Sequence, residues 1–351
     1  MKLLKRLLKR VLVVVAVLAV VFGAFIAYLG ITTPGPREAD VWVRLPDLPH
    51  PRGEMAAAVG ARVADDECRP GEPCESSLTQ LLVMGGLSGL GSTSDLVDVF
   101  DPGTGTWRDG PRLPEPRHHI GAAGTGGVIY VSGGAKTATD WTPEANFWEL
   151  DPTETQWRVL PDMPEARMGH QMVALNNKLY VIGGRGTTSN VLVYDPIAGQ
   201  WSIGAEMPEQ RDHLVAATAG YLVYAIGGRD EEVTDRVDVY DVNTDSWSAG
   251  PPLPVPMSGM AVATLSDGIH VVGGEQPAVI GGHVVDRHFV LKPGGDEWTD
   301  AALPIVATHG SASAMVRGGL VIAGGARRQS AFSPLGWTGI VEVYDPANAD
   351  D

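Results

Sequence analysis

Short apolar segments separated by turn residues recur along most of this chain. One repeat contains the apolar segment Gln171–Leu175, an Asn-Asn pair, and a second apolar segment, Leu179–Ile182, that ends in a Gly-Gly pair. A third segment alternates apolar and polar residues up to an Asp-Pro pair, as in Val191–Pro196, and a fourth begins at a tryptophan. Alternation with a period of two predicts strands, and the Asn, Gly and Pro pairs predict turns. The pattern therefore predicts a repeated unit of four short strands.

The unit occurs six times. A Gly-Gly pair ends the second strand of each unit, and the first members of successive pairs are 48, 50, 44, 46 and 51 residues apart. The pairs are Gly85-Gly86, Gly133-Gly134, Gly183-Gly184, Gly227-Gly228, Gly273-Gly274 and Gly324-Gly325. A period near 50 is typical of propeller blades with four strands. We interpret the glycine pairs and the repeated tryptophans as structural, for close backbone approach and packing between blades.

The last unit stops at Asp345-Pro346, before its fourth strand. In the five earlier units the fourth strand starts at a tryptophan: Trp107, Trp157, Trp201, Trp247 and Trp298. Residues 41–49 show the same fourth-strand pattern at the other end of the chain. Because a closed ring removes free sheet edges, we expect residues 41–49 to complete the last blade, with the strand of Trp42 beside Val341–Tyr344.

The first 40 residues follow a different pattern. Five lysines and arginines within residues 1–10 precede an apolar run of 19 residues, from Val11 to Leu29. Such a run can span about 30 Å of hydrocarbon as a helix. A cleaved signal peptide is the alternative, but its apolar core is usually about 7–15 residues. By the positive-inside rule we expect a cytoplasmic segment 1–10, a transmembrane anchor 11–29, a linker 30–40 and an extracytoplasmic propeller 41–351 in the cell membrane.

Composition and charge narrow the function. The chain has 44 glycines and 26 prolines in 351 residues, which suits many tight turns. Its formal net charge of −16 argues against a nucleic-acid partner. The two cysteines, Cys68 and Cys74, lie in one polar insertion. In an oxidising compartment we expect them to form a local disulfide.

With these features, the chain from Trp42 onward resembles the kelch family of β-propellers. The Gly-Gly pairs, the third strands that end in Tyr-Asp-Pro or a similar sequence, and the spaced tryptophans carry the resemblance, although Lys292-Pro293 replaces Asp-Pro in the fifth unit. The resemblance implies an all-β, six-bladed kelch propeller, here preceded by one transmembrane helix.

Strand order predicts that the segment before each innermost strand and the loop after each Gly-Gly pair share one face, here called the mouth. Four arginines precede innermost strands (Arg52, Arg117, Arg167 and Arg211), two follow Gly-Gly pairs (Arg185 and Arg229), and His119 and His213 lie two residues after an arginine. Guanidinium groups bind carboxylates well, so we expect these eight residues to form an anion-binding site. The alternative for the first four is that they tie blades to backbone carbonyls or aspartates.

The predicted function is recognition of a protein loop or an acidic glycan at this mouth. The alternative is a carbohydrate-active enzyme similar to the periplasmic sialic-acid mutarotases (epimerases), which bind an anionic sugar with arginine and a glutamate; Glu54 and Glu275 lie near the mouth. Neither glutamate matches a catalytic motif, so no catalytic residue is assigned; binding is favoured and enzyme activity is left open. No cofactor and no metal are expected, and the segment from His283 to His288 is expected to be a solvated loop.

Overall fold

The computed structural model describes residues 15–17, 19–20, 41–63, 77–89, 91–151, 153–277, 283–328 and 336–346. The chain divides into two units, Met1–Gly35 and Pro36–Asp351. In the first unit the described residues are helical. No helix formed by described residues is long and apolar enough to cross a membrane. The predicted span 11–29 lies largely outside the described residues, and Cys68 and Cys74 lie entirely outside them.

The second unit contains six antiparallel sheets of four strands, here called blades 1 to 6 and given from the innermost strand outward. Blade 1 contains β2 (Ala56–Val63), β3 (Ser77–Met84), β6 (Val97–Asp101) and β7 (Thr106–Asp109). Blade 2 contains β8 (Gly121–Thr125), β9 (Val128–Ser132), β10 (Phe147–Leu150) and β11 (Arg158–Leu160). Blade 3 contains β12 (Gln171–Leu175), β13 (Lys178–Ile182), β14 (Asn190–Asp195) and β15 (Gln200–Glu206).

The remaining blades repeat this order. Blade 4 contains β16 (Val215–Ala219), β17 (Leu222–Ile226), β18 (Val237–Asp241) and β19 (Ser246–Ala249). Blade 5 contains β20 (Ala261–Leu265), β21 (Gly268–Val272), β24 (His288–Leu291) and β25 (Trp298–Asp300). Blade 6 contains β26 (Ala312–Val316), β27 (Gly319–Ala323), β28 (Val341–Tyr344) and β1 (Trp42–Leu45). Two small hairpins, β4 (Leu87–Ser88) with β5 (Ser92–Thr93) and β22 (Glu275–Gln276) with β23 (His283–Val284), extend the loops of blades 1 and 5.

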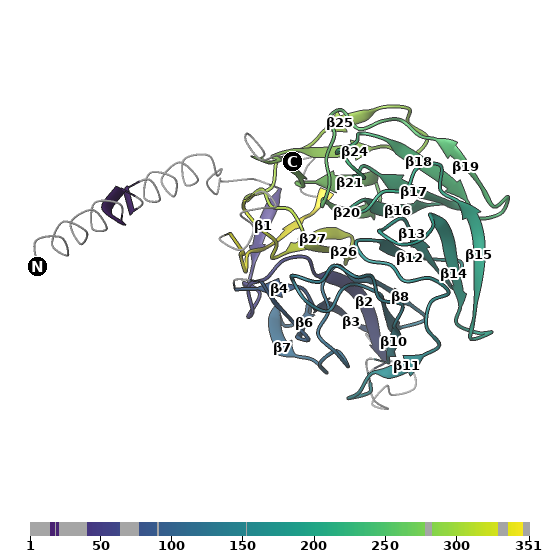
Figure 1. Ribbon diagram of the computed structural model, residues 1–351, viewed down its shortest axis with the longest axis horizontal. Helices are drawn as coiled ribbons and strands as arrows, with labels where there is room; N and C mark the ends of the chain where they lie inside the picture. The colour runs from purple at the N-terminus through teal and green to yellow at the C-terminus, as the bar shows by residue number, and fades with distance from the viewer. Residues whose placement is uncertain are drawn as a thin grey trace, which may run out of the picture. The chain divides into compact units, whose positions relative to one another are not determined.

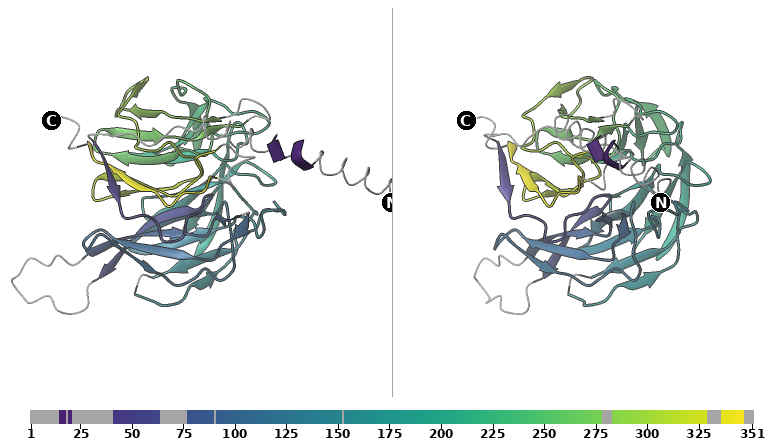
Figure 2. Two further views of the ribbon diagram at one scale, coloured as in Figure 1. Left: turned by 90° about the vertical axis from the view of Figure 1, so that its left-hand side faces the viewer. Right: turned by 60° about the vertical axis from the view of Figure 1, so that its left-hand side comes forward.

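The blades form a ring, and Figure 1 shows their innermost strands β2, β8, β12, β16, β20 and β26 around a common centre. The expected closure is present: β1 pairs with β28, with Trp42 opposite Tyr344 and Leu45 opposite Val341. In Figure 2 the purple strand β1 lies beside the yellow strands of the C-terminal part. The two ends of the propeller sequence therefore share one sheet, and this closure confirms the six-bladed all-β fold.

The glycine pairs connect each blade to the next. The amide of each second glycine donates a hydrogen bond of 2.7–3.0 Å to the carbonyl at the position of the arginine before the next blade: that of Arg117, Arg167, Arg211, Met257, Thr308 and, across the closure, Arg52. The first glycine lies so close that a Cβ on Gly273 would come within 2.3 Å of the Thr308 carbonyl oxygen. Both glycines of a pair also have positive φ, so a side chain is disfavoured by the backbone conformation as well as by the close approach.

The tryptophans provide a second set of links between blades. Each indole Nε1 donates to a carbonyl of the preceding blade's outer edge; these bonds join Trp42 to Ala302, Trp107 to Pro46, Trp157 to Pro111, Trp201 to Pro161, Trp247 to Ala205 and Trp298 to Pro251. Trp42 is thus the sixth member of the series and 2% exposed. The interpretation of the tryptophans as structural is confirmed.

Among the described residues, the apolar core consists of six clusters, and each lies between two consecutive blades. The cluster around Leu48, Val83 and Val341 joins blades 6 and 1, and the cluster around Trp42, Val272 and Leu320 joins blades 5 and 6. The other four join blades 1 and 2, 2 and 3, 3 and 4, and 4 and 5. Because every blade buries both of its faces against neighbours, no blade can leave the ring without exposing two clusters.

Candidate functional site

The mouth is assembled as the strand order predicts. In every blade the segment before the innermost strand forms a β-bridge with the residue that follows the Gly-Gly pair; these bridges are Gly53 with Leu87, His118 with Ala135, Met168 with Arg185, Asp212 with Arg229, Ser258 with Glu275, and His309 with Ala326. Segments that are far apart in the sequence of one blade are therefore side by side on the same face.

At the centre of the mouth, six backbone amides form a closed ring of hydrogen bonds. One residue from each blade donates its N–H to the carbonyl of the equivalent residue in the preceding blade, over 2.7–3.0 Å. In order of donation the residues are His119 to Glu54, Gly169 to His119, His213 to Gly169, Gly259 to His213, Gly310 to Gly259 and Glu54 to Gly310. The ring surrounds a cavity of about 80 Å³ that all six residues line.

Every residue of this ring has a positive φ, between 52° and 65°. Glycine adopts this conformation freely and occupies three of the six positions, whereas other residues adopt it rarely. The remaining three positions carry the side chains of Glu54, His119 and His213, here called the axial triad. A strained backbone kept at three equivalent positions is a common mark of functional sites.

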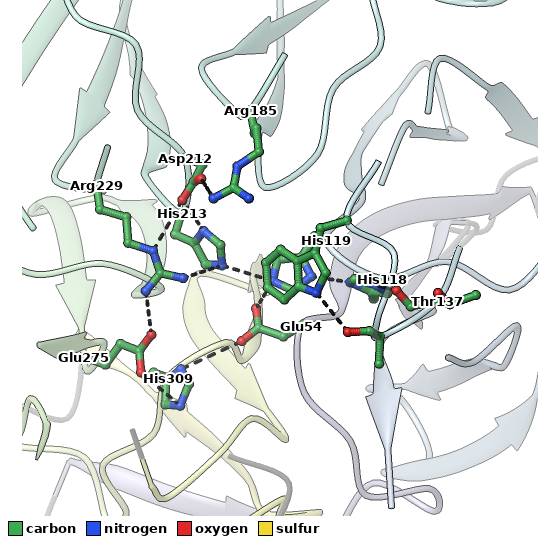
Figure 3. Close-up of polar contacts among 12 residues, drawn as sticks. Glu54, His118, His119, Thr137, Arg185, Asp212, His213, Arg229, Glu275 and His309 are labelled. Atoms are coloured by element: carbon green, nitrogen blue, oxygen red, sulfur yellow. Dashed lines mark hydrogen bonds and ion pairs between the residues drawn. The ribbon is translucent and has the colours of Figure 1, made fainter. Parts of the chain in front are cut away.

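The axial triad brings three ligand-type atoms together. His119 Nε2 lies 3.0 Å from His213 Nε2 and 3.3 Å from Glu54 Oε2. Figure 3 shows the three side chains directed toward one another. His119 and His213 are 6% and 8% exposed. The triad is thus a compact, largely buried polar cluster on the propeller axis.

Two histidine contacts fix the outer sides of the triad. His118 Nδ1 lies 2.5 Å from His119 Nδ1, and His118 Nε2 lies 2.9 Å from the Thr137 carbonyl oxygen. On the other side, His213 Nδ1 lies 2.5 Å from Asp212 Oδ1. Both triad imidazoles are therefore held through Nδ1, so that Nε2 of each is directed to the axis.

Charged groups from blades 3 to 6 surround the triad. Arg229 donates to His213 Nε2 at 3.1 Å and to Glu275 Oε1 at 3.0 Å, and its Nε lies 3.4 Å from Asp212 Oδ1. Arg185 donates to Asp212 Oδ2 at 3.0 Å. His309 Nε2 lies 3.5 Å from Glu275 Oε2. Three carboxylates (Glu54, Asp212 and Glu275) thus face two guanidinium groups (Arg185 and Arg229).

The environment sets the protonation of the cluster. Burial, reinforced by the imidazoles of His213 and His118, holds the pKa of His119 well below its usual value. Burial also lowers the pKa of His118, against the opposing effect of its bond to the Thr137 carbonyl. Burial acts to raise the pKa of Asp212, but the hydrogen bond from His213 and the charges of Arg229 and Arg185 outweigh it, so the pKa is lowered. At neutral pH His118 and His119 are neutral and Asp212 is ionised.

An exposed aromatic side chain flanks the cluster. The Trp141 ring lies 4.8 Å from the His119 ring, centroid to centroid, and the Arg185 guanidinium carbon lies 5.8 Å from the Trp141 centroid. Trp141 Nε1 donates to the Ala138 carbonyl, which fixes the ring. Trp141 is 37% exposed and the Arg185 side chain 52% exposed. The two side chains form a rim at the opening of the mouth.

The structure brings together half of the eight residues predicted to form the anion site. Arg185, Arg229, His119 and His213 lie within one network, whereas Arg52, Arg117, Arg167 and Arg211 are at most 2% exposed. Each of the latter four bonds within its own blade; Arg52 donates to Asp98 Oδ2 at 2.5 Å and to the Gly85 carbonyl, and Arg211 to Asp238 Oδ2 and the Gly227 carbonyl. This corrects the expectation that all six arginines line the mouth: burial among carbonyls and carboxylates makes these four structural ties.

Sequence reasoning did not assign Asp212, His118, His309 or Trp141 to the site, and it left Glu54 and Glu275 without a role. A signal for the triad exists in the sequence. When the six segments before the innermost strands are aligned on the arginine position, the position two residues later reads Glu54, His119, Gly169, His213, Gly259 and Gly310. Side chains at a position that is otherwise glycine point to a function beyond the fold.

A six-bladed ring with glycine pairs, linking tryptophans and an axial mouth defines a kelch-type propeller. A family model described as "Kelch motif" matches residues 74–114, 116–164, 166–208 and 210–254, which together cover half of the chain. The chain therefore belongs to the kelch-repeat family, whose propellers are generally protein-binding modules.

Similar curated proteins match over parts of the chain. "Kelch-like protein 34" of Homo sapiens is 31% identical over 115 residues, 32% of this chain and 18% of that protein. "Kelch-like protein terF" of Aspergillus terreus is 28% identical over 161 residues, 42% of this chain and 31% of that protein. "Rab9 effector protein with kelch motifs" of Gallus gallus is 32% identical over 142 residues, 38% of this chain and 34% of that protein. The matches span about a third or less of these relatives' own length, so the similarity extends to kelch repeats and not to the whole of these proteins.

Proposed function

We propose that this chain is a membrane-anchored, extracytoplasmic binding module that holds an acidic loop of a partner protein at the rim of its mouth. Membership of the kelch family supports protein binding in general, and one relative is named as an effector of another protein, Rab9. The apolar run 11–29 and the basic residues before it support the anchor and its orientation.

The observation that carries the proposal is the exposed pair of Trp141 and Arg185. Tryptophan and arginine are the residue types that most often dominate the energy of protein interfaces. Among the described residues, Arg185 donates a side-chain hydrogen bond only to Asp212. A guanidinium group has five N–H donors in all. The remaining donors suit a carboxylate of a bound loop, while the Trp141 ring offers apolar contact area.

The charges of the neighbouring loop set the expected position of the ligand. Asp230, Glu231 and Glu232 are exposed on the loop that follows Arg229 in blade 4. Like charges repel an acidic segment, so we expect it on the side of blades 2 and 3, where Trp141 and Arg185 lie.

Selection from a displayed library of constrained loops, with the full-length chain in lipid nanodiscs as bait, tests the binding function. Selected loops should be enriched in Asp and Glu, and Trp141→Ala or Arg185→Ala should weaken their binding by at least about tenfold, since interface anchors typically contribute 2 kcal/mol or more. Arg158→Ala and Ile197→Ala, which remove an exposed arginine and an exposed apolar side chain outside the mouth, serve as matched controls.

Loops without acidic residues, or binding that survives both mouth variants, would contradict the proposal. The same variants on an array of acidic glycans test the other ligand class, and glycan binding without loop binding would replace the protein loop as the ligand. Protease added to intact cells tests the location: cleavage of the propeller from outside is expected, and full protection would contradict export.

A further inference from the structure

We propose that the axial triad of Glu54, His119 and His213 is a binding site for a divalent first-row transition-metal ion such as Zn²⁺. This inference goes beyond the proposed function, because it concerns the floor of the mouth and does not depend on any partner. Two imidazoles and one carboxylate are a common ligand set for such ions. The three ligand atoms all lie within 4.8 Å of one another.

Hydrogen-bond partners assign the tautomers of the histidines. The Thr137 carbonyl only accepts, so His118 donates to it from Nε2, which leaves His118 Nδ1 as the acceptor toward His119. His119 must therefore donate from Nδ1 to His118 Nδ1. On the opposite side, the Asp212 carboxylate accepts from Arg185, and His213 donates to its Oδ1 from Nδ1. Arg229 can only donate, so its contact with His213 Nε2 makes that atom an acceptor, and the Nε2 atoms of both histidines are directed at the axis.

These two nitrogens and a carboxylate oxygen converge, and Arg229 donates to one of them, His213 Nε2. His119 Nε2 contacts His213 Nε2 at 3.0 Å and Glu54 Oε2 at 3.3 Å, and with these tautomers all three atoms are acceptors. Within the part of the chain that the structure describes, no group donates to His119 Nε2. Three converging ligand atoms, one of them without a donor, suit a cation placed between them.

The spacing suits a metal ion. Zinc binds histidine nitrogen and carboxylate oxygen at about 2.0–2.2 Å, so two ligand atoms of a tetrahedral site lie roughly 3.3–3.6 Å apart. The distances of 3.0 and 3.3 Å from His119 Nε2 to the other two ligand atoms are close to this range. Each histidine also has the outer support typical of metal ligands: Asp212 for His213, and the His118–Thr137 chain for His119.

Binding of an ion by His213 requires Arg229 to move away from His213 Nε2. Its Nη2 donates to His213 Nε2 at 3.1 Å, so the ion would replace this hydrogen bond. Arg229 also contacts Glu275 and Asp212, which can retain the guanidinium when it leaves His213. The carboxylates of Glu54, Asp212 and Glu275 outnumber the guanidinium groups of Arg185 and Arg229, which favours an added cation.

A fourth coordination position is open toward the cavity. The cavity of about 80 Å³ is lined by all three triad residues and by His170, and its volume exceeds the roughly 10–15 Å³ needed for one water. His170 is 4% exposed, and its Nδ1 has no hydrogen-bond partner among the described residues. A water bound to the ion can therefore occupy this space.

Titration of the full-length chain in detergent tests the site. After removal of metal with a chelator, Zn²⁺ is added in a calorimeter and Co²⁺ is followed by visible absorption; we expect one ion per chain. His119→Asn and His213→Asn keep a residue type that tolerates positive φ, and each should weaken binding by at least about 100-fold, as removal of a direct ligand should exceed the 10–100-fold effect of an outer partner. Glu54→Gln should weaken binding by at least about tenfold.

Arg229→Gln distinguishes this site from others on the chain. It removes the competing donor and a positive charge, so Zn²⁺ should bind more tightly, by about tenfold or 1.4 kcal/mol. Nitrogen-15 NMR of the histidine side chains needs no variant: Zn²⁺ should shift the Nε2 resonances of two histidines.

Matched controls cover the other metal-ligand group among the described residues and the two cysteines. His50→Asn disrupts the cluster of His50, Asp98 and Asp109, and a Cys68→Ser, Cys74→Ser double variant removes both thiols; both should bind one ion as before. Loss of binding in either control would place the ion elsewhere and overturn the proposal. So would the absence of stoichiometric binding, unchanged affinity in the triad variants, or an Arg229→Gln protein that binds no more tightly.

Discussion

The amide of Glu54 donates a hydrogen bond of 2.7 Å to the carbonyl oxygen of Gly310, which joins the first innermost segment of the propeller to the last. This bond closes the ring of six backbone hydrogen bonds at the axis, while the pairing of Trp42 with Tyr344 closes the ring at its outer edge. The same closure that stabilises the fold places Glu54 beside His119. Stability and site geometry are therefore linked.

Loss of the outer closure should destabilise the whole propeller. Trp42→Ala removes a buried side chain that packs on Tyr344 and bonds to Ala302, so we expect the free energy of unfolding to fall by about 3–5 kcal/mol. Val43→Ala in the same strand is a matched control, since Val43 is 48% exposed, and should change it by less than about 0.5 kcal/mol. Urea denaturation followed by tryptophan fluorescence measures both. Equal stability of the two variants would show that β1 does not hold the ring.

The glycine pairs should be far less tolerant of a side chain than other glycines with the same backbone angle. Gly273 and Gly294 have φ of 68° and 70°, but a Cβ on Gly273 would meet the Thr308 carbonyl at 2.3 Å, whereas a Cβ on Gly294 meets nothing within 4 Å. Gly294→Ala should cost about 1 kcal/mol for the backbone angle alone. Gly273→Ala should lower the thermal midpoint well beyond that of Gly294→Ala. Similar midpoints would mean that blades 5 and 6 can separate locally without cost.

The buried arginines should matter for stability. Arg52 is fully buried against Asp98, so Arg52→Ala leaves a buried carboxylate without its guanidinium partner and should cost about 3–5 kcal/mol. Arg158 pairs with Glu149 but is largely exposed, and Arg158→Ala should cost less than about 1 kcal/mol. Chemical denaturation at pH 7 compares the two. A small loss in Arg52→Ala would instead leave this arginine available for a role at the mouth.

Acid should destabilise the protein partly through His288. Burial lowers the pKa of His288 to about 4, although its bond to the Ala302 carbonyl opposes the shift. Because histidine in the unfolded chain has a pKa near 6.5, the unfolded state binds more protons between about pH 6.5 and 4. The contribution of His288 to stability is complete above pH 6.5 and is lost as the pH falls to 4, by roughly 3 kcal/mol.

Denaturation of His288→Gln at several pH values between 7 and 4.5 measures this contribution. The variant should be less stable at pH 7, because it repacks a buried ring, but its stability should fall less steeply with acid than that of the wild type. His283→Gln, at an exposed position, should keep the wild-type slope. Parallel curves for His288→Gln and the wild type would contradict the assignment.

Some expectations from the sequence were wrong for a definite reason. His288 was expected in a solvated loop, but it is buried in β24, where it bonds to His270 and stacks edge-on against Tyr344. The sequence placed the end of the third strand of blade 5 at Lys292-Pro293, but that strand already begins at His288. The partners of His288 come from β21 and from the far end of the chain, so nothing in its local sequence indicates burial.

For the arginines, too, the sequence predicted the position along the chain but not the partners that are distant in the sequence. The sequence places Arg52 at the start of blade 1, but its partner Asp98 is 46 positions away. Only the paired strands reveal that Asp98 lies inside the blade, within reach of the guanidinium. Arg185 and Arg229 lie on loops after the Gly-Gly pairs, and there the sequence correctly predicted residues of the mouth.

The sequence by itself determined the repeat, the number of blades and the closure by residues 41–49, because strand alternation, turn residues and glycine pairs are local features repeated six times. The tertiary structure alone decided which polar side chains meet. His119 and His213 are 94 positions apart, and their Nε2 atoms approach to 3.0 Å because a ring returns equivalent residues of different blades to one axis. Contacts across the axis depend on closure and on side-chain direction at a positive φ, and neither is encoded within a single repeat.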